Sequence, residues 1–201
     1  MTSKDATNGF NYSQSDRRVF LSKPGAHCEA EIIEASRRSE ALHRPWVFPP
    51  RSHEEYESYL ERIRSGHTIG FLVRRKSDET LAGVINVSEP VMGVFRSAYL
   101  GFYAFAGSER QGYMTEGLSL VLDRAFVALD FHRLEANIQP TNQASIALVG
   151  RLGFRKEGFS PRYLMIDGVW RDHEHWAILS DEWPECRQRL FASWGGDGRE
   201  S

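Results

Sequence analysis

The feature that most constrains this chain is the series of elements between residues 99 and 158. An aromatic-rich run over residues 99–105 is typical of a strand, and the polar turn 107–112 follows it. Over residues 115–129, apolar side chains recur every three or four positions, which predicts a helix that opens just after Gly112. The unpaired N–H groups and the positive dipole end of such a helix attract anions. The segment therefore predicts a site for a phosphorylated ligand, such as a pyrophosphate.

Three motifs follow one another in and just after this segment: a Gly-bearing turn at 109–114, an Asn-x-x-Ser at 142–145 and a Leu-Gly-Phe at 152–154. Together they resemble the acyl-CoA-binding core of the GCN5-related N-acetyltransferases, and within them the RimJ/RimL group of ribosomal-protein-alanine acetyltransferases. The family carries (Gln or Arg)-x-x-Gly-x-(Gly or Ala) at the turn, and here that frame falls on residues 109–114. An Asn-x-x-Ser follows at 142–145 and a Leu-Gly-Phe at 152–154, and the likeness extends over roughly residues 18–180. Glu109 departs from the family's Gln or Arg and places a carboxylate near the phosphates. Met114 stands where many members have a small residue.

The rest of the pattern predicts one α+β domain over residues 17–194, with flexible tails at 1–16 and 195–201. Ser52 and Glu55 form a capping box, and Ala30, Ile33 and Ala41 are expected near the buried face of the first helix. Strands are expected at 18–22, 68–74, 81–87, 98–105, 134–139, 163–166 and 169–179, and helices at 27–40, 52–66, 115–129 and 143–152, with another within 180–194.

The resemblance implies a GNAT-type acyl-CoA N-acyltransferase fold, in which helices flank a mixed, mostly antiparallel sheet. Strands 98–105 and 134–139 would splay apart to form the CoA cleft. Pro140 is a candidate for the cause of that separation, because proline has no N–H to donate to a neighbouring strand.

Composition limits the classes of function. The 201 residues include 41% hydrophobic side chains, enough for one buried core, and the net charge of −2 gives no global attraction to nucleic acid or anionic membranes. Residues 1–16 have no apolar core of a signal peptide, and no stretch approaches the ~18 apolar residues of a membrane helix. Two cysteines, Cys28 and Cys186, are too few for a disulfide framework or a zinc site, and His173 with His175 lacks a third ligand at metal-binding spacing. We expect a cytoplasmic monomer or homodimer that binds no metal.

The resemblance also implies how acetyl-CoA would be held. The backbone amides around the turn would bind the pyrophosphate, and the open strand edge would pair with the pantetheine arm as an added strand would. Arg110 and Arg151 are candidates for phosphate contacts, although both are equally consistent with solvated side chains. Asn142 is an ordinary N-cap to which the resemblance adds a pantetheine contact. The predicted acetyl-CoA contacts are Phe102, Tyr103, Ala104, Arg110, Gln111, Gly112, Tyr113, Met114, Thr115, Asn142, Ser145 and Arg151.

Ser145 is the candidate catalytic residue. The resemblance places its hydroxyl near the CoA sulfur, and a thiol of pKa about 8.5 needs only a weak donor to leave. Val149 occupies the position where many relatives place a tyrosine acid, which adds weight to Ser145. Asn137 falls where some relatives have a catalytic Glu and cannot accept a proton at neutral pH. Glu116 and Glu135 lie nearby, but solvent or an ion pair explains Glu135 more simply, so a water relay is an alternative to a dedicated base.

The acceptor is expected to meet a stiff aromatic rim formed by loop 43–50 and the final hairpin. Its predicted contacts are Arg44, Trp46, Tyr163 and Trp170, and core packing would also explain Trp46. We expect an acetyl-CoA-dependent N-acetyltransferase acting on a primary amine, first of all the N-terminal α-amine of a protein or peptide, with ribosomal proteins as one possibility. Two alternatives stay open: an acyl-CoA-binding sensor or scaffold without turnover, and an acetyltransferase for small-molecule amines.

Overall fold

The computed structural model describes residues 17–195. The predicted tails therefore lie outside the described residues, except for Gly195, which ends the last helix. The strands are β1 (Val19–Ser22), β2 (Thr68–Arg75), β3 (Leu81–Val91), β4 (Ser97–Ala104), β5 (Arg133–Ile138), β6 (Arg155–Ile166) and β7 (Val169–Leu179). The helices are the 3-10 turn η2 (Ala26–Cys28), α1 (Glu29–Arg38), α2 (Glu40–His43), α3 (His53–Arg64), α4 (Tyr113–Asp123) with its π-helical continuation η3 (Arg124–Ala128), α5 (Gln143–Arg151) and α6 (Trp183–Gly195).

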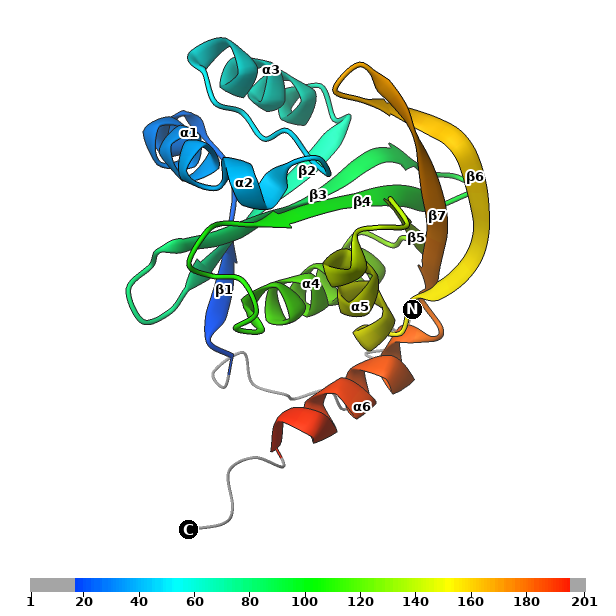
Figure 1. Cartoon of the computed structure of the whole chain (residues 1–201). Helices are drawn as coiled ribbons and strands as arrows, with labels where there is room; N and C mark the ends of the chain where they lie inside the picture. Colours follow the sequence, from blue (N-terminus) through cyan, green and yellow to red (C-terminus); the bar gives the residue numbers. More distant parts are fainter. Residues whose placement is uncertain (1–16, 196–201) are drawn as a thin grey trace, which may run out of the picture.

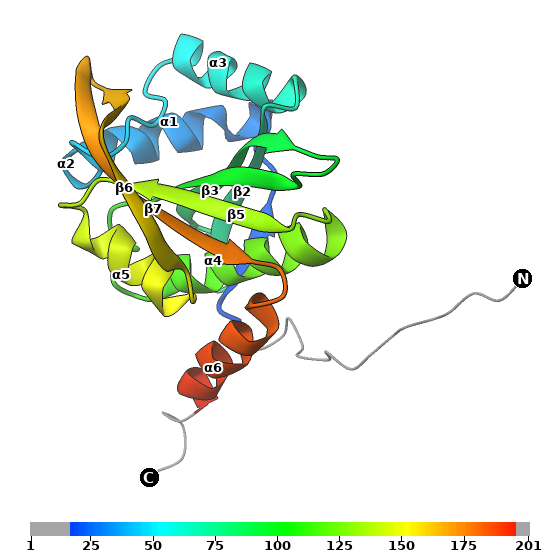
Figure 2. The same ribbon diagram turned by 90° about the vertical axis from the view of Figure 1, so that its right-hand side faces the viewer.

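The strands form one mixed sheet in the order β1-β2-β3-β4-β5-β7-β6, which confirms the predicted fold class. Every neighbouring pair is antiparallel except β4 and β5, which run parallel. Helices α1, α2 and α3 lie over one face of the sheet, and α4 and α5 lie over the other (Figure 1). The view turned by 90° shows the same layers, with β5, β6 and β7 nearest the viewer (Figure 2).

The parallel pair β4 and β5 separates partway along its length. Only three residue pairs connect the two strands, from Ser97 opposite Arg133 to Tyr99 opposite Glu135. Beyond that point β4 continues alongside β3, while β5 continues alongside β7 to Ile138. The predicted splay is confirmed. Pro140 is not its cause, because the separation begins at Glu135, well before the proline.

Two hydrophobic cores cover the two faces of the sheet. The larger contains β4 and β5 residues such as Leu100 and Leu134, packed with Leu118 and Leu122 of α4. The smaller lies beneath α1 and α3 and includes Tyr56. Alternation along each strand sends successive side chains to opposite cores, so each strand of the cleft presents residues to both sides.

The predicted helix over 27–40 is interrupted. The Ser39 hydroxyl donates to the carbonyl of Ala35 at 2.6 Å and accepts from the N–H of Ala106 at 2.9 Å, which ties the junction of α1 and α2 to the chain after β4. The prediction that Ala30 and Ala41 lie near the buried face of this helix was wrong, since both are exposed. The buried positions are Cys28, Ile32, Ala35, Ser36 and Ser39, because a small residue such as serine can occupy a tightly packed face despite its polarity.

Other elements differ mainly in length. Strand β6 begins at Arg155 rather than at 163. The prediction missed its first residues because β6 is an edge strand with irregular register near Gly158 and Ser160, and most of its side chains are exposed. The capping residue of α3 was predicted correctly, since the Ser52 side chain accepts from Glu55 N. The reciprocal half of the box differs, because the Glu55 carboxylate accepts from the N–H of Arg51 at 2.6 Å.

Candidate active site

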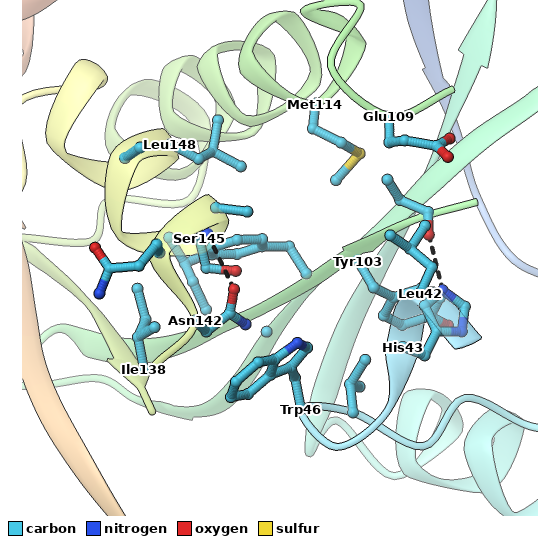
Figure 3. A pocket seen from close by; sticks show the side chains of 18 of the residues that line it. Leu42, His43, Trp46, Tyr103, Glu109, Met114, Ile138, Asn142, Ser145 and Leu148 are labelled. Atoms are coloured by element: carbon cyan, nitrogen blue, oxygen red, sulfur yellow. Dashed lines mark hydrogen bonds between the residues drawn. The ribbon is translucent and has the colours of Figure 1, made fainter. Parts of the chain in front are cut away.

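A cleft of about 780 Å³ opens where β4 and β5 separate. Figure 3 shows Ser145 of α5 and the α5 N-cap Asn142 on one wall, with Met114 of α4 opposite Leu148, and with Tyr103, Leu42 and His43 on the other side. The lining includes Phe102 and Ile138, whose side chains face the α4 core, and Asn137 and Tyr103, whose side chains face the α1 and α3 helices. The cleft therefore reaches both faces of the sheet.

The edge of β4 that faces the cleft has unused hydrogen-bonding groups. Phe105, just past the end of β4, donates its N–H to the carbonyl of Ala82 in β3, so alternation turns the N–H and C=O of Phe102 and Ala104 toward the cleft. The Ala104 carbonyl lies 2.8 Å from Nε2 of His43. The groups of Phe102 remain available to an extended ligand.

The first turn of α4 meets the cleft with unpaired amides. The first bond within the helix runs from Glu116 N to Gly112 O, so the N–H groups of Tyr113, Met114 and Thr115 have no intrahelical acceptor. Gly112 precedes them with φ of 81°, in the left-handed region that glycine adopts without strain. This geometry fits the phosphates of a CoA-type ligand.

The loop before α4 is braced by its own side chains. The Glu109 carboxylate accepts from the Gly107 N–H at 2.6 Å, and the Gln111 amide donates to the Gly107 carbonyl at 2.6 Å. Glu109 and Arg110 line the cleft, whereas the side chains of Gln111 and Tyr113 do not. The Tyr113 ring instead packs under the Arg18 guanidinium, whose Cζ lies 4.9 Å from the ring centroid.

A second arginine reaches this end of the cleft from α5. Arg151 lines the cleft, and its Nη1 lies 3.5 Å from the Thr115 hydroxyl in the first turn of α4. Its position beside the unpaired amides is the geometry expected of a phosphate contact.

Helix α5 begins as predicted. The Asn142 side chain accepts from Ser145 N at 3.2 Å, which confirms the N-cap, and both residues line the cleft. The Ser145 hydroxyl projects into the open space (Figure 3) and has no hydrogen-bond partner among the described residues. Val149 is fully buried in the larger core and does not line the cleft.

Neither of the two glutamates considered as bases lines the cleft. Glu135 forms an ion pair with Arg133 at 2.7 Å, which confirms the simpler of its two interpretations. Glu116 is buried and accepts from the Arg18 Nε at 2.6 Å and from its backbone N–H at 2.8 Å. Asn137 does line the cleft, and its Oδ1 accepts from His175 Nδ1 at 2.7 Å, while His175 Nε2 lies 2.8 Å from the Ser160 hydroxyl.

The four predicted acceptor contacts are only partly brought together. Trp46 lines the cleft. Arg44 is paired with Glu40 at 2.9 Å and with Asp167 at the tip of the β6–β7 hairpin at 3.4 Å, so it joins the α2–α3 loop to that hairpin. Tyr163 lies with its ring 4.8 Å from the His175 ring, and Trp170 is 54% exposed on β7, away from the cleft.

Two buried histidines line the cleft and were not predicted as site residues. His43 and His173 are each 3% exposed, and burial lowers the pKa of both below the ordinary value for histidine. His43 packs edge-on against Tyr103 and Phe105 and bonds to the open edge of β4. Its place at the end of a short helix, before a run rich in aromatics and prolines, carried no signal that separates it from a surface histidine.

Comparison with known proteins agrees with this geometry. Residues 18–155 match the family model described as Acetyltransferase (GNAT) domain, so the chain belongs to the GNAT acetyltransferases. It is an N-acetyltransferase that uses acetyl-CoA as donor. Among the described residues, no helix is long and apolar enough to cross a bilayer.

Individual relatives show which acetyltransferases the chain is similar to. YjcK of Bacillus subtilis (strain 168), named a probable N-acetyltransferase, is 34% identical over 62% of this chain and 68% of its own length. The [ribosomal protein uS5]-alanine N-acetyltransferase of Escherichia coli (strain K12) is 35% identical over 62% of this chain, but the alignment covers only 64% of that enzyme. The structure of Mycobacterium smegmatis RimJ in complex with CoA-disulfide superposes with a TM-score of 0.79 at 28% identity, covering 88% of this chain and 89% of RimJ.

Proposed function

We propose that this enzyme acetylates the N-terminal α-amine of a protein or peptide, and that Ser145 protonates the departing thiolate. Acetyl-CoA would supply the activated acyl group. Its phosphates would be held by the N-terminal amides of α4 with Arg110 and Arg151, and its pantetheine arm by the open edge at Phe102 and by Asn142.

Within the part of the chain that the structure describes, no carboxylate lines the acceptor side of the cleft, and this observation supports the choice of acceptor. The side chains there include His43, Trp46, Asn137 and His173. Among the described residues, the one carboxylate that lines the cleft is Glu109, at the phosphate end and already bonded to Gly107 N. A polyamine would leave its additional ammonium groups without ionic partners in such a cleft. A peptide N-terminus brings a single ammonium.

Asn137 favours the same acceptor. Because its Oδ1 accepts from His175, its amide N–H groups remain for an incoming acceptor. A carbonyl of the peptide backbone, close to the α-amine, is a suitable partner for such a donor. A simple alkylamine has no such carbonyl.

Two further arguments support an α-amine over lysine. At pH 7 roughly a tenth of an α-amine of pKa 7.7–8.0 is neutral, against about 0.04% of a lysine side chain of pKa about 10.4. The similarity to a ribosomal-protein-alanine acetyltransferase and to RimJ points to protein N-termini as well.

The test compares three acceptors: a peptide with a free N-terminus and no lysine, the same peptide N-blocked with one lysine, and a polyamine. Release of CoA is measured from about pH 6.5 to 9.5, a span that crosses the α-amine pKa and approaches that of lysine. We expect the free N-terminus to have the highest kcat/KM at pH 7, with the advantage over lysine narrowing as the pH rises. Equal or higher kcat/KM for lysine or the polyamine at pH 7 would refute the proposal. Acetyl-CoA binding without turnover of any amine would favour a sensor.

A further inference from the structure

We propose that His173 is the general base that takes the proton from the acceptor amine. The inference rests on the proposed reaction, but it does not depend on which amine is the natural acceptor. It starts from the position of the residue, on β7, opposite Ser160 of β6 and just beyond the last pairing of β7 with β5.

The strand register places His173 on the acceptor side. Asn137 and His175 are paired across β5 and β7 and share a face, as their 2.7 Å hydrogen bond requires. His173 is two residues from His175, so its side chain has the same orientation. On the same face, Tyr103 of β4 packs against the core under α1 and α3. Ser145 and the amides of α4 lie on the opposite face, so His173 and Ser145 bound the cleft from its two sides.

Hydrogen bonding fixes which nitrogen of His173 can act as the base. Nδ1 lies 3.0 Å from the Arg171 carbonyl, which can only accept, so Nδ1 carries the proton in the neutral ring. Nε2 is then the nitrogen with the free lone pair. It has no hydrogen-bond partner among the described residues, and it is not among the unpartnered side-chain atoms, such as Ser36 Oγ and His43 Nδ1, that are sealed from solvent. Because His173 lines the cleft, this lone pair is available to an amine there.

The other histidine in the cleft cannot play this part. Nε2 of His43 donates to the Ala104 carbonyl, so the lone pair is on Nδ1. Nδ1 of His43 is sealed from solvent and has no partner among the described residues. An amine in the cleft cannot reach it, and His43 is better described as a residue that positions the end of β4.

The surroundings keep His173 neutral at pH 7. Burial lowers its pKa, and the nearby His175 lowers it further, while the bond to Arg171 and the charge of Asp172 act in the opposite direction. From β6, the Tyr163 ring meets the imidazole edge-on at 5.9 Å. Asn137 of β5, on the same face of the sheet, is uncharged, and His43 of α2, which also lines the cleft, has a pKa lowered by burial.

In the acyl transfer, His173 accepts the proton of the amine and Ser145 supplies the proton of the departing thiolate. An amine that arrives as an ammonium gives one proton to His173 Nε2, and the freed lone pair forms the N–C bond to the acyl carbon. The C–S bond breaks, and its electron pair leaves on sulfur, which takes a proton from the Ser145 hydroxyl. As the amide forms, the nitrogen loses its second proton to solvent, and Ser145 regains a proton from solvent. The imidazolium of His173 then releases the first proton to solvent.

The test compares His173→Ala and His173→Gln with His53→Gln, which replaces an exposed histidine remote from the cleft and should leave turnover unchanged. With a peptide acceptor at pH 7, we expect kcat to fall at least a hundredfold in both His173 variants, in the range of general-base catalysis. The acetyl-CoA-dependent rise in Tm should be retained. The acid limb of kcat/KM should move up to the amine pKa of about 7.7–8.0, because only the neutral amine then reacts. Added imidazole should restore turnover to His173→Ala.

Two results would overturn the assignment. A loss of less than about threefold in both variants would remove His173 from proton transfer, since general bases contribute far more. A large loss without imidazole rescue or movement of the acid limb would mean a positioning role. If the wild type turns over no peptide but acetylates another amine, the same comparison is made on that amine, and only the proposed acceptor fails.

Discussion

Ser145 combines two roles, because its backbone N–H caps α5 through Asn142 while its hydroxyl faces the cleft. We expect Ser145→Ala to lower kcat ten- to a hundredfold with little change in the KM for acetyl-CoA, because a proton donor to sulfur acts mainly in the transition state. Steady-state kinetics at saturating acceptor provides the measurement.

Asn142→Ala is the matched control for Ser145→Ala. It should cost about 1 kcal/mol of stability through the lost N-cap and raise the KM for acetyl-CoA more than it lowers kcat. If kcat of Ser145→Ala equals that of the wild type where chemistry limits turnover, Ser145 has no part in the mechanism.

At the level of single residues, the sequence predicted the groups that belong to short motifs. Asn142, Ser145 and Gly112 occupy the wall of the cleft, where their motifs placed them. His43 and His173 could not be predicted, because each becomes part of the site through an interaction distant in sequence. His43 bonds to Ala104, and His173 enters the cleft only because β7 pairs with β5.

At the level of elements, the role of the first turn of α4 can be tested by comparing substitutions at two glycines of the same loop. Gly112 and Gly107 both have positive φ, of 81° and 88°. A Cβ on Gly112 would lie 2.9 Å from the Arg18 Nη2, whereas a Cβ on Gly107 would meet nothing within 4 Å. Alanine at either site should cost about 1–2 kcal/mol through left-handed strain.

Only Gly112→Ala should also weaken acetyl-CoA binding, because it disturbs the amides that face the phosphates. At a hundredfold excess over Kd the ligand should add about 2.7 kcal/mol to the wild type and to Gly107→Ala, and clearly less to Gly112→Ala. Thermal melts with and without acetyl-CoA measure the difference. Equal shifts in all three proteins would place the phosphate site elsewhere.

The elements themselves were predicted well where periodicity reports burial. The helix predicted over 52–66 forms as α3, with Tyr56 and Leu60 buried one turn apart, and the two residues between the predicted strands 163–166 and 169–179 form a turn with positive φ at Asp167 and Gly168. The prediction failed on α1, where Ser36 on the helix and Ser39 at its C-cap are both buried. It also failed on β6, whose exposed edge position leaves no alternation of apolar and polar residues to recognise.

For the whole molecule, the buried histidines predict how stability depends on pH. His43 and His173 have a folded-state pKa below the unfolded value of about 6.5, so the unfolded chain binds more protons in acid. Their contribution is complete above about pH 6.5 and is lost as the pH falls toward the folded pKa. Exposed His53 has the opposite sign, because its hydrogen bond to Glu29 raises its pKa and favours the folded state in acid.

Three variants separate these contributions when the free energy of unfolding is measured by denaturant titration from about pH 5 to 8, a window around the histidine pKa. Compared with the wild type, His43→Gln and His173→Gln should lose less stability between pH 7 and 5, even where their stability at pH 7 is lower. His53→Gln should lose more over the same interval, since it lacks a group that gains protons on folding. Carboxylates remote from the substituted histidines titrate alike in all four proteins, so each difference in slope reports the substituted histidine together with its charged neighbour, Glu29 for His53 and Asp172 for His173. Parallel curves for His43→Gln, His173→Gln and the wild type would contradict the burial of neutral imidazoles in the folded enzyme, and with it a neutral His173 beside the acceptor amine.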